Sequence, residues 1–106
     1  MNLSSKELQE KIKSEEKFLV DLYADWCGPC KMMKPIIDKL SEEFIKENKE
    51  VKLYKFNIEE DKELALRLGV RSIPTLIGFN AGEKKVTKIG LLNEKQIIDL
   101  TKEVLT

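Results

Sequence analysis

Two cysteines, Cys27 and Cys30, are the residues of this sequence best suited to covalent chemistry. They are its only cysteines, and the sequence contains no histidine. A Cys-x-x-Cys pair inside a strand–helix–strand segment is typical of a reversible dithiol–disulfide couple. Residues three apart in a first helical turn lie roughly 5–6 Å apart, which a disulfide can span. A zinc ion shared between two chains, or a pair of inert core cysteines, is the alternative that the two residues alone leave open.

The position of the pair predicts a separate role for each sulfur. We expect a helix to begin near Pro29 or Cys30, and a helix N-terminus favours a thiolate. Cys27 is nearest that end, so we expect it to be the more exposed and the more readily ionised thiol. Its thiolate would attack a substrate disulfide, and Cys30 would then attack Cys27 and release the substrate as a dithiol.

Asp21 and Lys55 are charged residues in segments that are otherwise apolar. Asp21 interrupts the apolar run 18–24, and burial favours the protonated form of a carboxylate. Because there is no histidine, Asp21 is the candidate acceptor for the proton that Cys30 must lose. Lys55 shares the strand face of apolar neighbours, which makes it the candidate partner of Asp21. A satisfied structural carboxylate and a solvated lysine are the alternatives for these two residues.

The elements needed to position these residues alternate along the chain. Hydrophobic periodicity and capping signals predict helices near 4–17, 29–46, 61–68 and 93–105, and strands at 18–24, 51–58, 75–79 and 85–89. The strand–helix–strand start predicts a parallel pair, and the final hairpin adds antiparallel strands. We therefore expect one α/β domain over residues 1–106. Gly78, inside a predicted strand, indicates a bulge or a close backbone approach.

Composition excludes several classes of function. The 19 basic and 19 acidic residues give no net charge, whereas a nucleic-acid binder would show a basic excess. No apolar run is long enough to span a membrane. Residues 1–17 are polar and lack the apolar stretch of a signal peptide, so we expect a cytoplasmic protein. In that reducing compartment a cysteine pair favours a catalytic role over a structural one.

The segment Trp26-Cys27-Gly28-Pro29-Cys30-Lys31 resembles the active site of the thioredoxin family. Asp21 lies six residues before Cys27, where that family keeps a buried carboxylate. The resemblance extends over nearly the whole chain, through Pro35, the segment 55–58, the loop 69–76 with Ile73 and Pro74, and Gly90.

This resemblance implies a thioredoxin fold, with a mixed sheet of four main strands flanked by four helices. Only residues 1–3 precede the first predicted helix, so we expect the family's first strand to be vestigial or absent. The resemblance also implies a cis peptide bond before Pro74 and pairing of an extended client segment with the Ile73 backbone. The implied docking surface consists of Trp26, Gly28, Pro29, Ile73, Pro74 and Gly90.

The function implied by the resemblance is that of a monomeric, cytoplasmic protein disulfide reductase. It would need no bound cofactor or metal beyond the Cys27–Cys30 disulfide, act on disulfide-containing client proteins, and be recycled by a thioredoxin reductase that draws on NADPH or ferredoxin. Gly28 and Pro29 between the cysteines resemble the reducing members of the fold rather than its oxidants and isomerases. A binding module with incidental redox activity, and a dedicated electron donor to one enzyme, are the rival interpretations.

Overall fold

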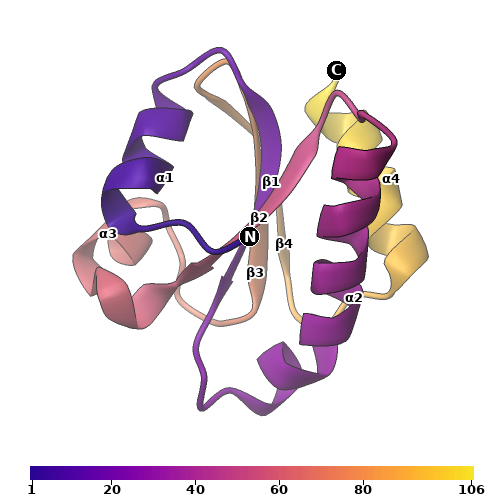
Figure 1. The fold of residues 1–106 in the computed structure, drawn as a ribbon. Helices are drawn as coiled ribbons and strands as arrows, with labels where there is room; N and C mark the ends of the chain where they lie inside the picture. The colour runs from indigo at the N-terminus through magenta and orange to yellow at the C-terminus, as the bar shows by residue number, and fades with distance from the viewer.

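The computed structural model describes residues 1–106, which form one sheet between two layers of helices (Figure 1). The strand order is β2-β1-β3-β4, with β1 parallel to β2 and antiparallel to β3, and β3 antiparallel to β4. The strands are β1 (Lys17–Tyr23), β2 (Lys52–Asn57), β3 (Thr75–Asn80) and β4 (Glu83–Ile89). The helices are α1 (Ser5–Ile12), α2 (Gly28–Lys46), α3 (Lys62–Arg67) and α4 (Glu94–Val104), with a short 3₁₀ helix η1 (Ile58–Glu60). The predicted order and the four-stranded mixed sheet are confirmed.

Local sequence signals account for where the helices begin. Ser4 and Glu7 form a reciprocal capping box at α1, and Asn93 and Gln96 form another at α4. The Asp61 side chain accepts a hydrogen bond from the Leu64 N–H and so caps α3. Each of these contacts satisfies a backbone donor that has no partner within its helix.

The two faces of the sheet hold separate apolar cores. Helices α2 and α4 cover one face and α1 and α3 cover the other, as Figure 1 shows. Along β1, Leu19 faces α2 and α4, whereas Phe18, Val20 and Leu22 face α1 and α3. Residues 18–22 of β1 are therefore buried, and Asp21, the charged residue among them, is enclosed by protein.

Residues 1–3 run beside β2 in place of a fifth strand. A single parallel bridge joins Asn2 to Lys55, with hydrogen bonds of 2.8 Å from the Leu3 N–H to the Lys55 carbonyl and from the Lys55 N–H to the Met1 carbonyl. The expected vestigial first strand is therefore confirmed as a single bridge beside β2. The segment covers part of the β2 edge next to Lys55.

Gly78 lies where α4 packs closely on β3. A Cβ atom at this position would clash with the Val104 side chain and would lie 2.8 Å from Val86 Cγ1 and 3.1 Å from Leu19 Cδ2. The register between β3 and β4 also shifts between Gly78 and Phe79. Both alternatives raised by the sequence, a bulge and a close approach, therefore apply here.

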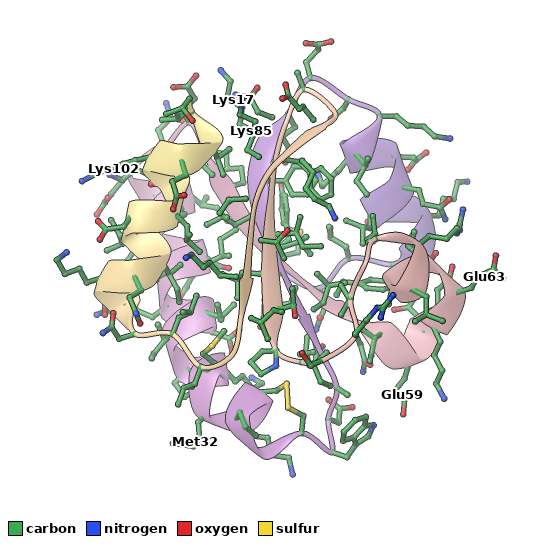
Figure 2. All side chains as sticks on the ribbon, turned by 180° about the vertical axis from the view of Figure 1, so that it is seen from behind. Lys17, Met32, Glu59, Glu63, Lys85 and Lys102 are labelled. Carbon is green, nitrogen blue, oxygen red and sulfur yellow. A yellow bond between two sulfur atoms is a disulfide. The ribbon has the colours of Figure 1, made fainter.

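The cysteine pair lies at the end of the sheet where β1 runs into α2. In Figure 2 the yellow disulfide is at the lower end of the molecule, near Met32, whereas Lys17, Lys85 and Lys102 are at the opposite end. This is the carboxyl end of the parallel strands β1 and β2, where α/β sheets commonly bind their ligands. None of the helices combines the length and the apolar composition that a membrane span requires.

Candidate active site

Cys27 and Cys30 are joined by a disulfide at the N-terminus of α2. Their Cα atoms are 5.2 Å apart, within the predicted spacing. Cys27 is the N-cap residue of α2, and the Cys30 N–H donates to Cys27 Sγ at 3.2 Å. Because this N–H points at the sulfur, it is placed to stabilise a negative charge on Cys27 when the disulfide opens. No cluster of three or more potential metal-ligating side chains is present.

Residue exposure does not separate the two cysteines in this oxidised form. Cys27 is 5% exposed and Cys30 is 4% exposed, so the expected greater exposure of Cys27 is not seen. The asymmetry lies instead in what each residue borders. Cys27 adjoins the loop before β3, whereas Cys30 borders a cleft with Asp21.

The loop before β3 places backbone against the reactive sulfur. The Ile73 carbonyl oxygen lies 3.8 Å from Cys27 Sγ, and the Ile73–Pro74 peptide bond is cis, as expected. The Gly90 N–H donates to the Pro74 carbonyl at 2.8 Å, which ties the end of β4 to this loop. Gly90 has φ +100°, a conformation that favours glycine, and its neighbours Ile89 and Leu91 are exposed apolar residues.

Trp26 and Ile73 lie on one groove beside the disulfide. The Trp26 side chain is 66% exposed, and its Nε1–H donates to Glu59 Oε1 at 2.9 Å. The groove has a volume of about 530 Å³ and lies between η1, α3 and the loop before β3; its lining includes Ile58, Ala65, Leu66 and Val70. Gly28 and Pro29 are exposed at the start of α2. Of the predicted docking residues, Ile73 therefore contacts Cys27 Sγ directly, while Gly90 is bonded to Pro74, which is buried.

Asp21 and Cys30 border a second cleft on the other side of the disulfide. Its volume is about 540 Å³, and Lys55, Lys31 and Lys34 are also among its lining residues. Asp21 is 2% exposed, and its Oδ1 has no hydrogen-bond partner. Burial raises the pKa of Asp21 to about 7; the charge of Lys55 acts to lower it, and that of Asp38 to raise it.

Lys55 lies beside Asp21 but is bonded elsewhere. The two residues are register partners on β1 and β2, and Lys55 is 8% exposed. Its Nζ forms a 2.7 Å salt bridge with Asp38 Oδ1 on α2. The predicted partnership with Asp21 is therefore one of proximity and charge, whereas the hydrogen-bonded partner of Lys55 is Asp38.

The structure adds Asp38 and Glu59 to the residues around the site. Asp38 follows Cys30 by eight residues and Lys34 by four, so all three lie on one face of α2. The spacing in the sequence indicates that Cys30, Lys34 and Asp38 share a helix face, but nothing in the sequence shows that this face contacts Lys55. Glu59 precedes α3, and only the folded structure brings it to Trp26.

Known proteins match this arrangement over most of the chain. The family model described as Thioredoxin matches residues 1–103. The chain belongs to the thioredoxin family. A thioredoxin of Rickettsia typhi is 47% identical over 90 residues, which cover 85% of this chain and 83% of that protein. One of Rickettsia bellii is 40% identical over 99 residues, covering 92% and 91%. A mutant thioredoxin from Halobacterium salinarum superimposes with a TM-score of 0.84 at 32% identity, covering 100% of this chain and 90% of that one.

As a member of this family, the chain is a protein dithiol–disulfide oxidoreductase that works through a redox-active cysteine pair. The family acts on disulfide substrates and is recycled by thioredoxin reductase. Cys27 and Cys30 are the cysteines of that pair, because they are the only two in the chain and they are bonded to each other.

Proposed function

We propose that this chain reduces disulfides of client proteins in the cytoplasm as a single-domain monomer. The observation that supports this best is the closed Cys27–Cys30 disulfide at a helix N-terminus, between an apolar groove and a cleft that holds a buried carboxylate. The groove offers a surface for a client chain, and the cleft offers a place for a proton. Gly28 and Pro29 between the cysteines favour the reducing direction.

The first half of the proposed reaction belongs to Cys27. Its thiolate attacks one sulfur of the client disulfide, an S–S bond forms between Cys27 and the client, and the client's other sulfur leaves as a thiolate. The Cys30 N–H directed at Cys27 supports the thiolate before attack. We assign the docking of the client to Trp26, Gly28, Pro29, Ile73, Pro74 and Gly90, with the Ile73 backbone pairing with an extended client segment.

The second half belongs to Cys30 and Asp21. Cys30 transfers its proton to the Asp21 carboxylate, directly or through water in the shared cleft, and its thiolate then attacks Cys27 Sγ. The second client sulfur leaves, so two electrons have passed from the cysteine pair to the client. Lys55 tunes the charge of Asp21 in this scheme. No further cofactor or metal enters, and a thioredoxin reductase, linked to NADPH or ferredoxin, returns the pair to the dithiol.

Reduction of insulin by dithiothreitol, with and without the protein, tests the proposed activity. The protein should accelerate precipitation of the insulin chains, and Cys27→Ser should abolish the acceleration. Reduced Cys30→Ser, mixed with insulin after dithiothreitol has been removed, should leave the first attack intact and accumulate a mixed disulfide visible by mass spectrometry. Acceleration by the double serine variant would contradict the proposal. Partner-dependent activity that survived in that variant would favour the binding-module interpretation instead.

A further inference from the structure

Asp38 binds two lysines at the mouth of the Asp21 cleft. Its Oδ1 is 2.7 Å from Lys55 Nζ, and its Oδ2 is 2.8 Å from Lys34 Nζ. The Lys55 side chain is 10% exposed, whereas those of Asp38 and Lys34 are 41% and 64% exposed. The buried ammonium is therefore held from the solvent side by a helix residue that is itself partly in water.

This contact leaves the more deeply buried carboxylate without a direct partner. Asp21 and Lys55 face each other across β1 and β2, yet Asp21 Oδ1 has no hydrogen bond. A buried carboxylate is costly unless it is paired or protonated. The nearest cation would relieve that cost if it turned toward Asp21, and Asp38 holds it in another direction.

No other polar or charged group around the cleft replaces Lys55 as a partner of Asp21. The Tyr23 hydroxyl donates to Asn2 Oδ1 at 2.6 Å, and its ring centroid lies 5.9 Å from Lys55 Nζ. Tyr23 is thus engaged with the N-terminal segment. The remaining charged groups near the cleft are the Met1 amine and the side chains of Asp25, Lys31 and Lys34, and none of them bonds Asp21 Oδ1.

We propose that Asp38 is a positioning residue that draws the Lys55 ammonium toward α2 and thereby keeps Asp21 free of a direct ion pair. This inference rests on the proposed role of Asp21 as the proton acceptor for Cys30. An Asp21 locked to Lys55 would hold its charge too stably to take a proton from a thiol, whereas an Asp21 without that partner binds a proton near neutral pH. Partial burial acts to raise the pKa of Asp38, but the hydrogen bonds from Lys34 and Lys55 together outweigh it and lower that pKa, so Asp38 stays charged across the neutral range.

The test is a titration of the Asp21 side-chain carbon by ¹³C NMR in the oxidised protein, where neither cysteine titrates. Asp38→Asn should lower the midpoint by about one pH unit, because Lys55 can then approach Asp21. Asp38→Glu, which keeps the charge, should return the midpoint toward the wild-type value. Asp99→Asn is the matched control, because Asp99 is also the acidic member of an i,i+4 pair with a lysine, Lys95, on an exposed helix face; it should leave the midpoint unchanged.

A second pair of variants distinguishes positioning from a simple effect of charge. Lys55→Gln should raise the Asp21 midpoint, the opposite direction to Asp38→Asn. In the Lys55→Gln background, Asp38→Asn should lower the midpoint by less than half as much as in the wild type, since no ammonium remains to be redirected. An equal shift in both backgrounds, or no shift in either, overturns the proposal.

The titration does not depend on turnover, so it separates this inference from the proposed function. If Asp38→Asn moves the Asp21 midpoint but Asp21→Asn leaves resolution of the mixed disulfide unchanged, the positioning contact holds and the proton-acceptor role fails. If the reverse is found, Asp38 has no such role. Circular dichroism and the thermal midpoint of each variant confirm that the fold is retained.

Discussion

At the scale of single residues, Asp21 links the fold to the chemistry. It lies on a strand whose two faces are both buried, so its charge cannot be solvated as it would be at the surface. Burial raises its pKa to about 7, against the opposing effect of Lys55. A carboxyl group with that proton affinity can accept a proton from a thiol and return it within the neutral range.

Asp21→Asn should slow resolution of the mixed disulfide by roughly a hundredfold or more while leaving the first attack by Cys27 nearly unchanged. The amide cannot accept the Cys30 proton, so slower transfer to water must replace it. In the wild type the resolution rate should rise with pH through an inflection near the Asp21 pKa of about 7, and the variant should lack that inflection.

Acid-quenched mass spectrometry can follow the mixed disulfide, and the fluorescence of Trp26, the only tryptophan, can follow closure of the disulfide beside it. Asp99→Asn serves again as the control on an exposed helix face. A wild-type pH profile retained by Asp21→Asn would remove Asp21 from the mechanism.

The residues that the sequence identified are those whose type conflicts with their surroundings. Asp21 and Lys55 stood out as charges in apolar strands, and the structure buries both. Asp38 did not stand out, because an aspartate four residues after a lysine on a helix is an ordinary surface pair. Its importance depends on a contact between α2 and β2, and no local pattern encodes that contact.

At the scale of elements, α2 connects the disulfide to the rest of the cleft. It begins with Cys27 as its N-cap, places Cys30 in its first turn and brings Asp38 to Lys55 two turns later. Further along, the buried Ser41 hydroxyl donates to the Leu53 carbonyl at 2.8 Å, which fastens the helix to β2. The spacing between cysteine pair and cleft is therefore set by one continuous helix.

The element order was predictable because each helix and strand has its own local signals. Capping boxes at Ser4 and Asn93 and the apolar run of β1 all appear where they were expected. The helix that carries the cysteines begins at Gly28, one or two residues before the predicted start. From the sequence, the role of Gly78 could be narrowed only to a bulge or a close backbone approach. The residue that packs on it, Val104 of α4, is 26 residues away in the sequence.

Gly78→Ala should destabilise the protein by about 1–3 kcal/mol, because the added methyl group meets the Val104 and Val86 side chains of a packed core. Urea unfolding of the oxidised protein, followed by circular dichroism, measures the change. Val104→Ala in the same chain should relieve the clash, so the double variant should lose less stability than the sum of the two single variants. Strict additivity would show that Val104 does not limit the space at Gly78.

At the scale of the whole molecule, buried apolar contacts on both faces of one sheet stabilise the fold. The buried carboxyl group of Asp21, near the cysteine pair, destabilises the folded state when it is charged. The cores on the two faces contain 12 and 11 buried residues, and they meet along β1, the strand that carries Asp21. A folded state that raises the pKa of a carboxyl binds its proton more tightly than the unfolded chain does. Stability is then lost as pH rises from the unfolded pKa toward the folded one.

Oxidised wild-type protein should therefore lose stability relative to Asp21→Asn as the pH rises from about 4 to about 8. Folding raises the pKa of Asp21 from its ordinary value of 3.8 to about 7, which corresponds to a change of about 4 kcal/mol across that interval. Urea unfolding of both proteins at a series of pH values measures the difference. The difference between the two proteins is the informative quantity, because carboxyls such as Glu59 and Asp61, whose pKa values are lowered, act on both proteins equally and in the opposite direction. A difference that stays constant over the whole of that pH interval would mean that Asp21 keeps an ordinary pKa in the folded protein, and the cleft would then hold a carboxylate too acidic to serve Cys30.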